Sequence, residues 1–202
     1  MTLTTTVAGE LMAAEIAEQP DVWRRLLSET NAADSDLGTA AELIKAYRPR
    51  FVQFVARGTS DHAALYAKYL AEIVLQLPCG LVSPSTMTAY GARPDLTGVL
   101  MIGVSQSGGS PDLVQSLQAA REQGALTIAV TNKPGSALAK TAQAHVDVRA
   151  GEERAVAATK SYTAQLLALY LLLDRVRGGD GSAPAAPPRL AEQLLAQEDT
   201  VA

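Results

Sequence analysis

The sequence predicts an α/β protein in which a three-layer α-β-α sandwich holds a five-stranded parallel sheet. Short β-rich apolar segments alternate with amphipathic helical segments, which is the pattern of βαβ units. The strongest apolar run, 99–104, is continuous rather than alternating, as a strand covered on both faces requires. With 202 residues, 48% of them hydrophobic, the chain can bury one domain core and carry an extension. Right-handed crossovers favour the strand order 2-1-3-4-5.

Residues 1–50 are expected to form an N-terminal helical extension. Leu11, Ile16, Trp23 and Leu26 recur at helical spacing, and Pro20 separates two helical runs. The sheet domain is expected at 51–177. Its predicted strands are 51–56, 80–83, 99–104, 126–130 and 145–148, and its predicted helices are 39–47 before the sheet, 61–77, 111–123, 136–143 and 156–176.

Glycine, proline and small residues dominate 178–189, which is typical of a linker. Leucines at helical spacing then start a new helix, so 190–202 is expected to be the start of a truncated second domain.

The composition argues against several classes of protein. A net charge of −4 disfavours nucleic-acid binding. One cysteine, Cys79, and two histidines, His62 and His145, disfavour a disulfide framework and a zinc site, and we expect neither metal nor cofactor. The N-terminus lacks the pattern of a signal peptide, and the longest apolar stretch, 166–173, is far shorter than the roughly 20 residues of a membrane span. A cytoplasmic protein without membrane contact is therefore expected.

Two turns rich in glycine and hydroxyl groups follow the first and third predicted strands. In the order 2-1-3-4-5 these strands are neighbours, and ligands bind outside their carboxyl ends. Helix N-termini with hydroxyl donors suit a phosphate monoester. Either turn alone could be an ordinary capped βα turn, but the pair favours a ligand site. Its predicted phosphate-binding residues are Thr59, Ser60, Ser105, Gln106, Ser107 and Ser110.

Five segments of the chain resemble the sugar isomerase (SIS) domain family. They are GELMAAEIAEQPDVW at 9–23, RGTSDHA at 57–63, SQSGGSPD at 105–112, TNKPGSALAK at 131–140 and GEERAVAATKSYTAQ at 151–165. The likeness is greatest to the isomerase half of glutamine–fructose-6-phosphate aminotransferases and to bacterial phosphosugar isomerases and deaminases. The resemblance implies phosphate contacts at the residues above. It also implies sugar contacts at Gly58, Val156, Ala157 and Ala158.

Some features depart from that pattern. Ala155 stands where the aminotransferases usually have glycine and Ala158 where they often have serine, which leaves the sugar undefined. The aminotransferases begin with a cysteine-dependent glutaminase domain, and the chain starts Met1-Thr2 instead. Their second SIS domain supplies the catalytic glutamate, and 190–202 resembles only its first helix. We therefore expect this chain to bind a sugar phosphate and to isomerise it poorly.

The resemblance implies the first SIS domain of an enzyme that isomerises or deaminates a hexose or amino-hexose 6-phosphate. The alternative is a non-catalytic module that senses a phosphosugar.

The candidate bases are Glu153, with its neighbour Glu152, and His62. Each has a simpler interpretation, since the glutamates would suit the N-terminus of the next helix and His62 would suit a surface position. Lys160 is expected to pair with a glutamate. The apolar helix expected at 156–176 predicts a homodimer.

Overall fold

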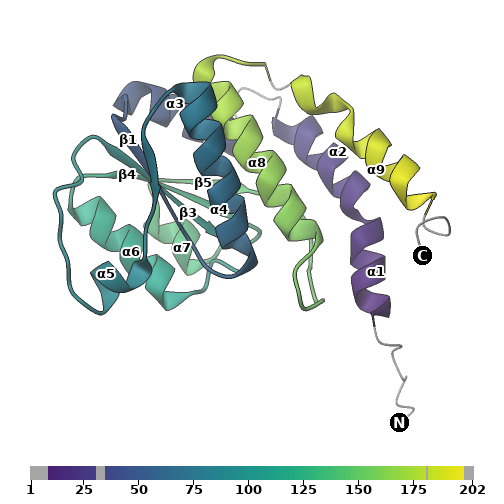
Figure 1. Ribbon diagram of the computed structural model, residues 1–202, viewed down its shortest axis with the longest axis horizontal. Helices are drawn as coiled ribbons and strands as arrows, with labels where there is room; N and C mark the ends of the chain where they lie inside the picture. Colours follow the sequence, from purple (N-terminus) through teal and green to yellow (C-terminus); the bar gives the residue numbers. More distant parts are fainter. Residues whose placement is uncertain (1–8, 31–34, 181, 198–202) are drawn as a thin grey trace, which may run out of the picture.

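Figure 1 shows the computed structural model, which describes residues 9–30, 35–180 and 182–197. All strand pairings are parallel, and the five-stranded sheet has the order β2-β1-β3-β4-β5. The predicted fold class and strand order are thereby confirmed. The strands are β1 (Phe51–Ala56), β2 (Cys79–Leu81), β3 (Val99–Ser105), β4 (Leu126–Thr131) and β5 (Ala144–Asp147).

Helices cover both faces of the sheet (Figure 1). One face carries α3 (Asp36–Tyr47), α4 (Thr59–Leu70) and α8 (Lys160–Arg177), and the other carries α5 (Pro84–Thr88), α6 (Pro111–Glu122) and α7 (Ala137–Thr141). Successive residues of β3 point to opposite faces, because side chains alternate along a strand. Ile102 therefore packs into the core beneath α3, α4 and α8, whereas Met101 packs beneath α6 and α7.

The N-terminal helices α1 (Glu10–Ala17) and α2 (Gln19–Thr30) lie beyond α8, together with the short turn η2 (Ala183–Ala185) and α9 (Pro187–Leu195). Trp23 on α2 donates its indole N–H to Thr163 Oγ1 on α8 at 3.3 Å. Arg24 forms an ion pair with Glu192 on α9. Pro20 falls in the first turn of α2, where its missing N–H breaks no helical hydrogen bond.

Several helix boundaries differ from those expected. The helix expected from 39 begins at Asp36, because Ser35 Oγ accepts a hydrogen bond from Gly38 N at 3.0 Å and caps it there. The helix expected from 61 begins at Thr59 and ends in a π-helical turn, η1 (Ala71–Leu75). The last helix begins at Pro187, since proline is well tolerated in a first helical turn. Helix α5 was not expected from the sequence.

The expected division of the chain at 50, 177 and 189 remains a proposal. Residues 1–8 and 31–34 of the expected extension, residue 181 of the expected linker and residues 198–202 of the expected second domain lie outside the described residues. Among the helices that the structure does describe, none combines the length and apolar character of a membrane span.

Candidate functional site

The two hydroxyl-rich turns lie next to each other at one edge of the sheet. Strands β1 and β3 are paired in register, with Ala56 opposite Val104, so both turns leave the sheet at the same level. An ion pair between Arg57 Nη1 and Asp112 Oδ2, 2.5 Å apart, joins the first turn to the start of α6. The two segments, far apart in the chain, therefore converge on one place.

The first turn brings the N-terminus of α4 to this edge. Gly58 occupies the N-cap position with φ 58°, a conformation that glycine adopts without steric cost. Thr59 and Ser60 form the first turn of the helix, whose leading N–H groups have no intrahelical partner. Ser60 is buried, with 7% of its surface exposed. Amides and hydroxyls at this position can donate to an anion.

The second turn is held by its own serines. Ser105 Oγ accepts a hydrogen bond from Gly108 N at 3.0 Å, and Ser107 Oγ accepts one from Gly109 N at 3.3 Å. Each hydroxyl still has its own proton to donate, since a serine hydroxyl can accept and donate at once. Ser110 lies at the N-cap of α6. Among the described residues of this helix, its side chain makes no capping hydrogen bond. The turn thus carries three serine hydroxyls in the segment that immediately precedes α6.

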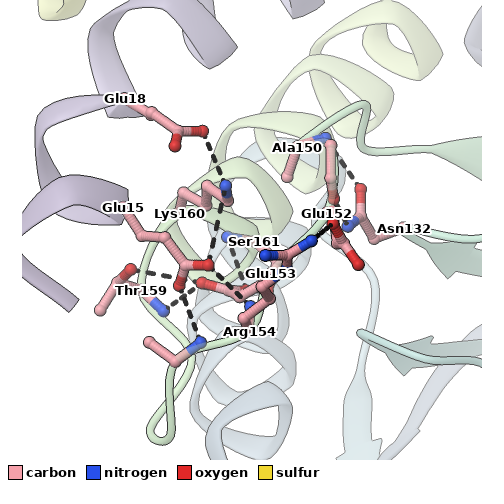
Figure 2. A network of polar contacts seen from close by, with 12 residues as sticks. Glu15, Glu18, Asn132, Ala150, Glu152, Glu153, Arg154, Thr159, Lys160 and Ser161 are labelled. Carbon is pink, nitrogen blue, oxygen red and sulfur yellow. Dashed lines mark hydrogen bonds and ion pairs between the residues drawn. The ribbon is translucent and has the colours of Figure 1, made fainter. Parts of the chain in front are cut away.

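Asn132, just after β4, connects the second turn to the loop after β5. Its backbone N–H donates to Gln106 O at 3.1 Å. Its side chain accepts from Ala150 N at 2.8 Å and donates to Gly151 O at 2.6 Å (Figure 2). No role was predicted for Asn132 from the sequence. Its position could have indicated one, because it lies in the segment 131–140 directly after β4, at the carboxyl end of the sheet where ligands of such folds commonly bind.

The predicted sugar-contact residues Val156, Ala157 and Ala158 lie in a loop and not at the start of a helix. Helix α8 was expected from 156 but begins at Lys160. The reason is Glu153, whose carboxylate accepts from Thr159 N at 2.6 Å and from Ser161 N at 3.2 Å and so defines the helix start. Val156 is 95% exposed at the tip of the loop. Val156 therefore projects into solvent instead of forming part of a helix.

The candidate bases occupy different surroundings. Glu153 also accepts from the hydroxyls of Thr159 and Ser161, so both carboxylate oxygens are engaged at the N-terminus of α8 (Figure 2). Glu152 is exposed and pairs with Arg154 at 2.7 Å, and this hydrogen bond lowers the pKa of its carboxyl. His62 is exposed on the first turns of α4. A catalytic role for Glu153 or His62 remains a prediction.

His145 lies in β5, with its ring Nε2 2.8 Å from Thr131 Oγ1. Burial lowers the pKa of its imidazole, which favours the neutral form at physiological pH. Across the described ranges 9–30, 35–180 and 182–197, no group of three or more His, Cys, Asp or Glu residues is arranged to hold a metal ion.

Comparison with known proteins identifies relatives of this arrangement. The SIS domain family matches residues 45–175. The chain is 39% identical over 165 residues to a glutamine–fructose-6-phosphate aminotransferase of Gloeobacter violaceus, covering 80% of this chain and 26% of that protein. It is 36% identical over 200 residues to the same enzyme of Methanothermobacter thermautotrophicus, covering 94% and 31%. The chain thus spans about a quarter to a third of the length of these curated relatives.

Solved structures show the same fold. A protein of Silicibacter pomeroyi DSS-3, provisionally named a phosphosugar isomerase, superposes with a TM-score of 0.83 at 39% identity, covering 92% of this chain and 55% of that chain. The C-terminal domain of the glucosamine-fructose-6-phosphate aminotransferase of Francisella tularensis superposes with a TM-score of 0.74 at 26% identity, covering 96% and 56%.

Proposed function

This chain belongs to the SIS domain family, and from that premise we propose that it binds a sugar phosphate for an isomerase or aminotransferase-like enzyme. The observation that carries the proposal is the convergence of the turns 57–60 and 105–110, joined by the Arg57–Asp112 ion pair. The relatives named above are enzymes of aminotransfer and isomerisation, which favours an enzyme over a sensing module.

The phosphate is proposed to lie between the N-termini of α4 and α6. Neutral donors that converge on a dianion spread its charge, and the helix dipoles add to this stabilisation. The sugar then extends toward the loop after β5, where Val156 is exposed. Asn132 connects this loop to the turn 105–110, through its hydrogen bonds to Gly151 O and Gln106 O. The proposed phosphate ligands are Thr59, Ser60, Ser105, Gln106, Ser107 and Ser110, and the proposed sugar contacts are Gly58, Val156, Ala157 and Ala158.

The role proposed for this chain is binding and positioning. A held phosphate fixes the reacting carbons of an open-chain sugar relative to a base, and such positioning removes a large entropic part of the barrier. Proton transfer between the carbons requires a base with a free lone pair. Both carboxylate oxygens of Glu153 accept hydrogen bonds from residues at the start of α8. This geometry favours a role in holding the start of the helix over a role as the base.

Titration calorimetry with fructose 6-phosphate and glucosamine 6-phosphate tests the proposal. Ser105→Ala removes a buried donor and should weaken binding by about 1–3 kcal/mol, roughly 5- to 150-fold. Ser107→Ala removes an exposed donor and should weaken binding by a smaller amount, about 0.5–1.5 kcal/mol. Ser28→Ala, on the exposed surface of α2, is the matched control. Affinity that stays unchanged in the Ser105/Ser107 double variant would remove the basis for the assignment.

A homodimer and a cytoplasmic location are also proposed. An open groove of about 470 Å³ lies between α2, α4 and α8 and is bordered by η2 and α9. Its lining is mostly apolar, which supports contact with a second copy, and includes Trp23, Tyr66, Leu166, Leu167, Tyr170, Pro184 and Pro187.

A further inference from the structure

Helix α1 presents a buried carboxylate to the loop that precedes α8. Glu15 is 3% exposed, and its oxygens accept hydrogen bonds from two successive amides, Arg154 N at 2.6 Å and Ala155 N at 3.1 Å (Figure 2). These residues are separated from Glu15 by about 140 positions in the chain. The loop is therefore anchored to α1 immediately before Val156.

The other end of the loop is anchored to the same helix region. Lys160, the first residue of α8, is 3% exposed, and its ammonium lies 2.7 Å from Glu18 and 3.9 Å from Glu15. The expected pairing of Lys160 with a glutamate is thus confirmed. Residues 154–160 form an arch whose two feet both contact the C-terminal end of α1, while its tip, Val156, is exposed.

The burial pattern of α1 shows that apolar packing is a small part of its attachment. Glu15 is the one buried residue of α1, whose sequence is ELMAAEIA, and Leu11 and Ile16 are 41% and 36% exposed. Burying a carboxylate costs free energy unless hydrogen bonds and a countercharge compensate. Here the two loop amides and Lys160 supply that compensation, so the helix and the arch order each other.

We propose that Glu15 is a positioning residue that holds the 154–160 arch in the shape that receives the sugar. This inference rests on the proposed function, in which the arch contacts the sugar and the two turns hold the phosphate. The phosphate turns have their own hydrogen bonds, between Ser105 and Gly108 and between Ser107 and Gly109. Loss of Glu15 therefore acts on recognition of the sugar and leaves recognition of the phosphate intact.

Two ligands separate these effects. For Glu15→Ala, calorimetry is expected to show affinity for fructose 6-phosphate falling about 10-fold, the scale of one lost hydrogen bond to a charged group. Affinity for inorganic phosphate is expected to stay within about twofold of the wild type. Glu15→Gln keeps the side-chain volume and one acceptor oxygen, and it should give a smaller change of the same kind. Glu10→Gln, an exposed position on the same helix, is the matched control.

Hydrogen–deuterium exchange measures the arch directly and needs no ligand. Glu15→Ala should speed exchange in the peptide that covers 151–158 and leave the peptide that covers 105–110 unchanged. Unchanged exchange at 151–158, or an equal loss of affinity for both ligands, would overturn the positioning role alone. If wild-type protein binds neither ligand, the proposed function fails, and the positioning role fails with it.

Discussion

Gly108 is tightly constrained within the second hydroxyl-rich turn, residues 105–110. Its φ of 61° lies in the left-handed region, and a Cβ built there would come 2.2 Å from Ser136 Oγ and 2.5 Å from Ser136 Cβ. Its carbonyl also accepts from Leu138 N at 3.0 Å, which binds the turn to α7. Any larger residue must therefore move the turn, the Ser136 segment, or both.

Gly108→Ala should lower the free energy of unfolding by about 2–5 kcal/mol. A non-glycine residue in the left-handed region costs roughly 1–2 kcal/mol, and overpacking a buried position costs about 1–3 kcal/mol. For a chain of this length the loss corresponds to a decrease in Tm of about 4–20 °C. Urea unfolding followed by circular dichroism gives the free energy, and calorimetry with fructose 6-phosphate should show weaker binding in the variant.

Gly109→Ala is the neighbouring control. A Cβ there would meet Ser107 Oγ at 3.8 Å, an ordinary van der Waals contact, so stability should change by about 0.5 kcal/mol or less. Equal urea midpoints for the two variants would show that neither the positive φ nor the close packing at Gly108 restricts this position to glycine.

Two further predictions concern His145 in strand β5 and the assembly of the chain. Burial lowers the pKa of His145 below its ordinary 6.5, so just below pH 6.5 the unfolded chain binds more protons than the folded one. The contribution of His145 to the free energy of unfolding should therefore be complete above pH 6.5 and fall as the pH drops below it. His145→Gln should flatten this pH dependence, as measured by urea unfolding. For the proposed homodimer, light scattering at micromolar concentration should give twice the chain mass of 21.1 kDa, and a monomer mass would contradict it.

Local sequence patterns predicted the sheet and its turns. Continuous apolar runs such as 99–104 indicated buried parallel strands, and right-handed crossovers left few possible strand orders. Glycine and serine after the first and third strands indicated where an anion would bind. Boundaries such as the start of α8 were missed. Where a helix starts depends on which side chain outside the helix accepts hydrogen bonds from its first amides, as Glu153 does at α8.

The sequence by itself determined the fold class and the position of the two hydroxyl-rich turns, since these follow from short-range periodicity and turn chemistry. The strand order followed from the handedness of the crossovers between parallel strands. Only the tertiary structure decided that Arg57 pairs with Asp112 and that Glu15 binds the amides of the 154–155 loop. Both contacts join residues far apart in the chain. Periodicity along the sequence carries no information on which charged side chain meets which backbone amide, because packing of whole helices sets that distance.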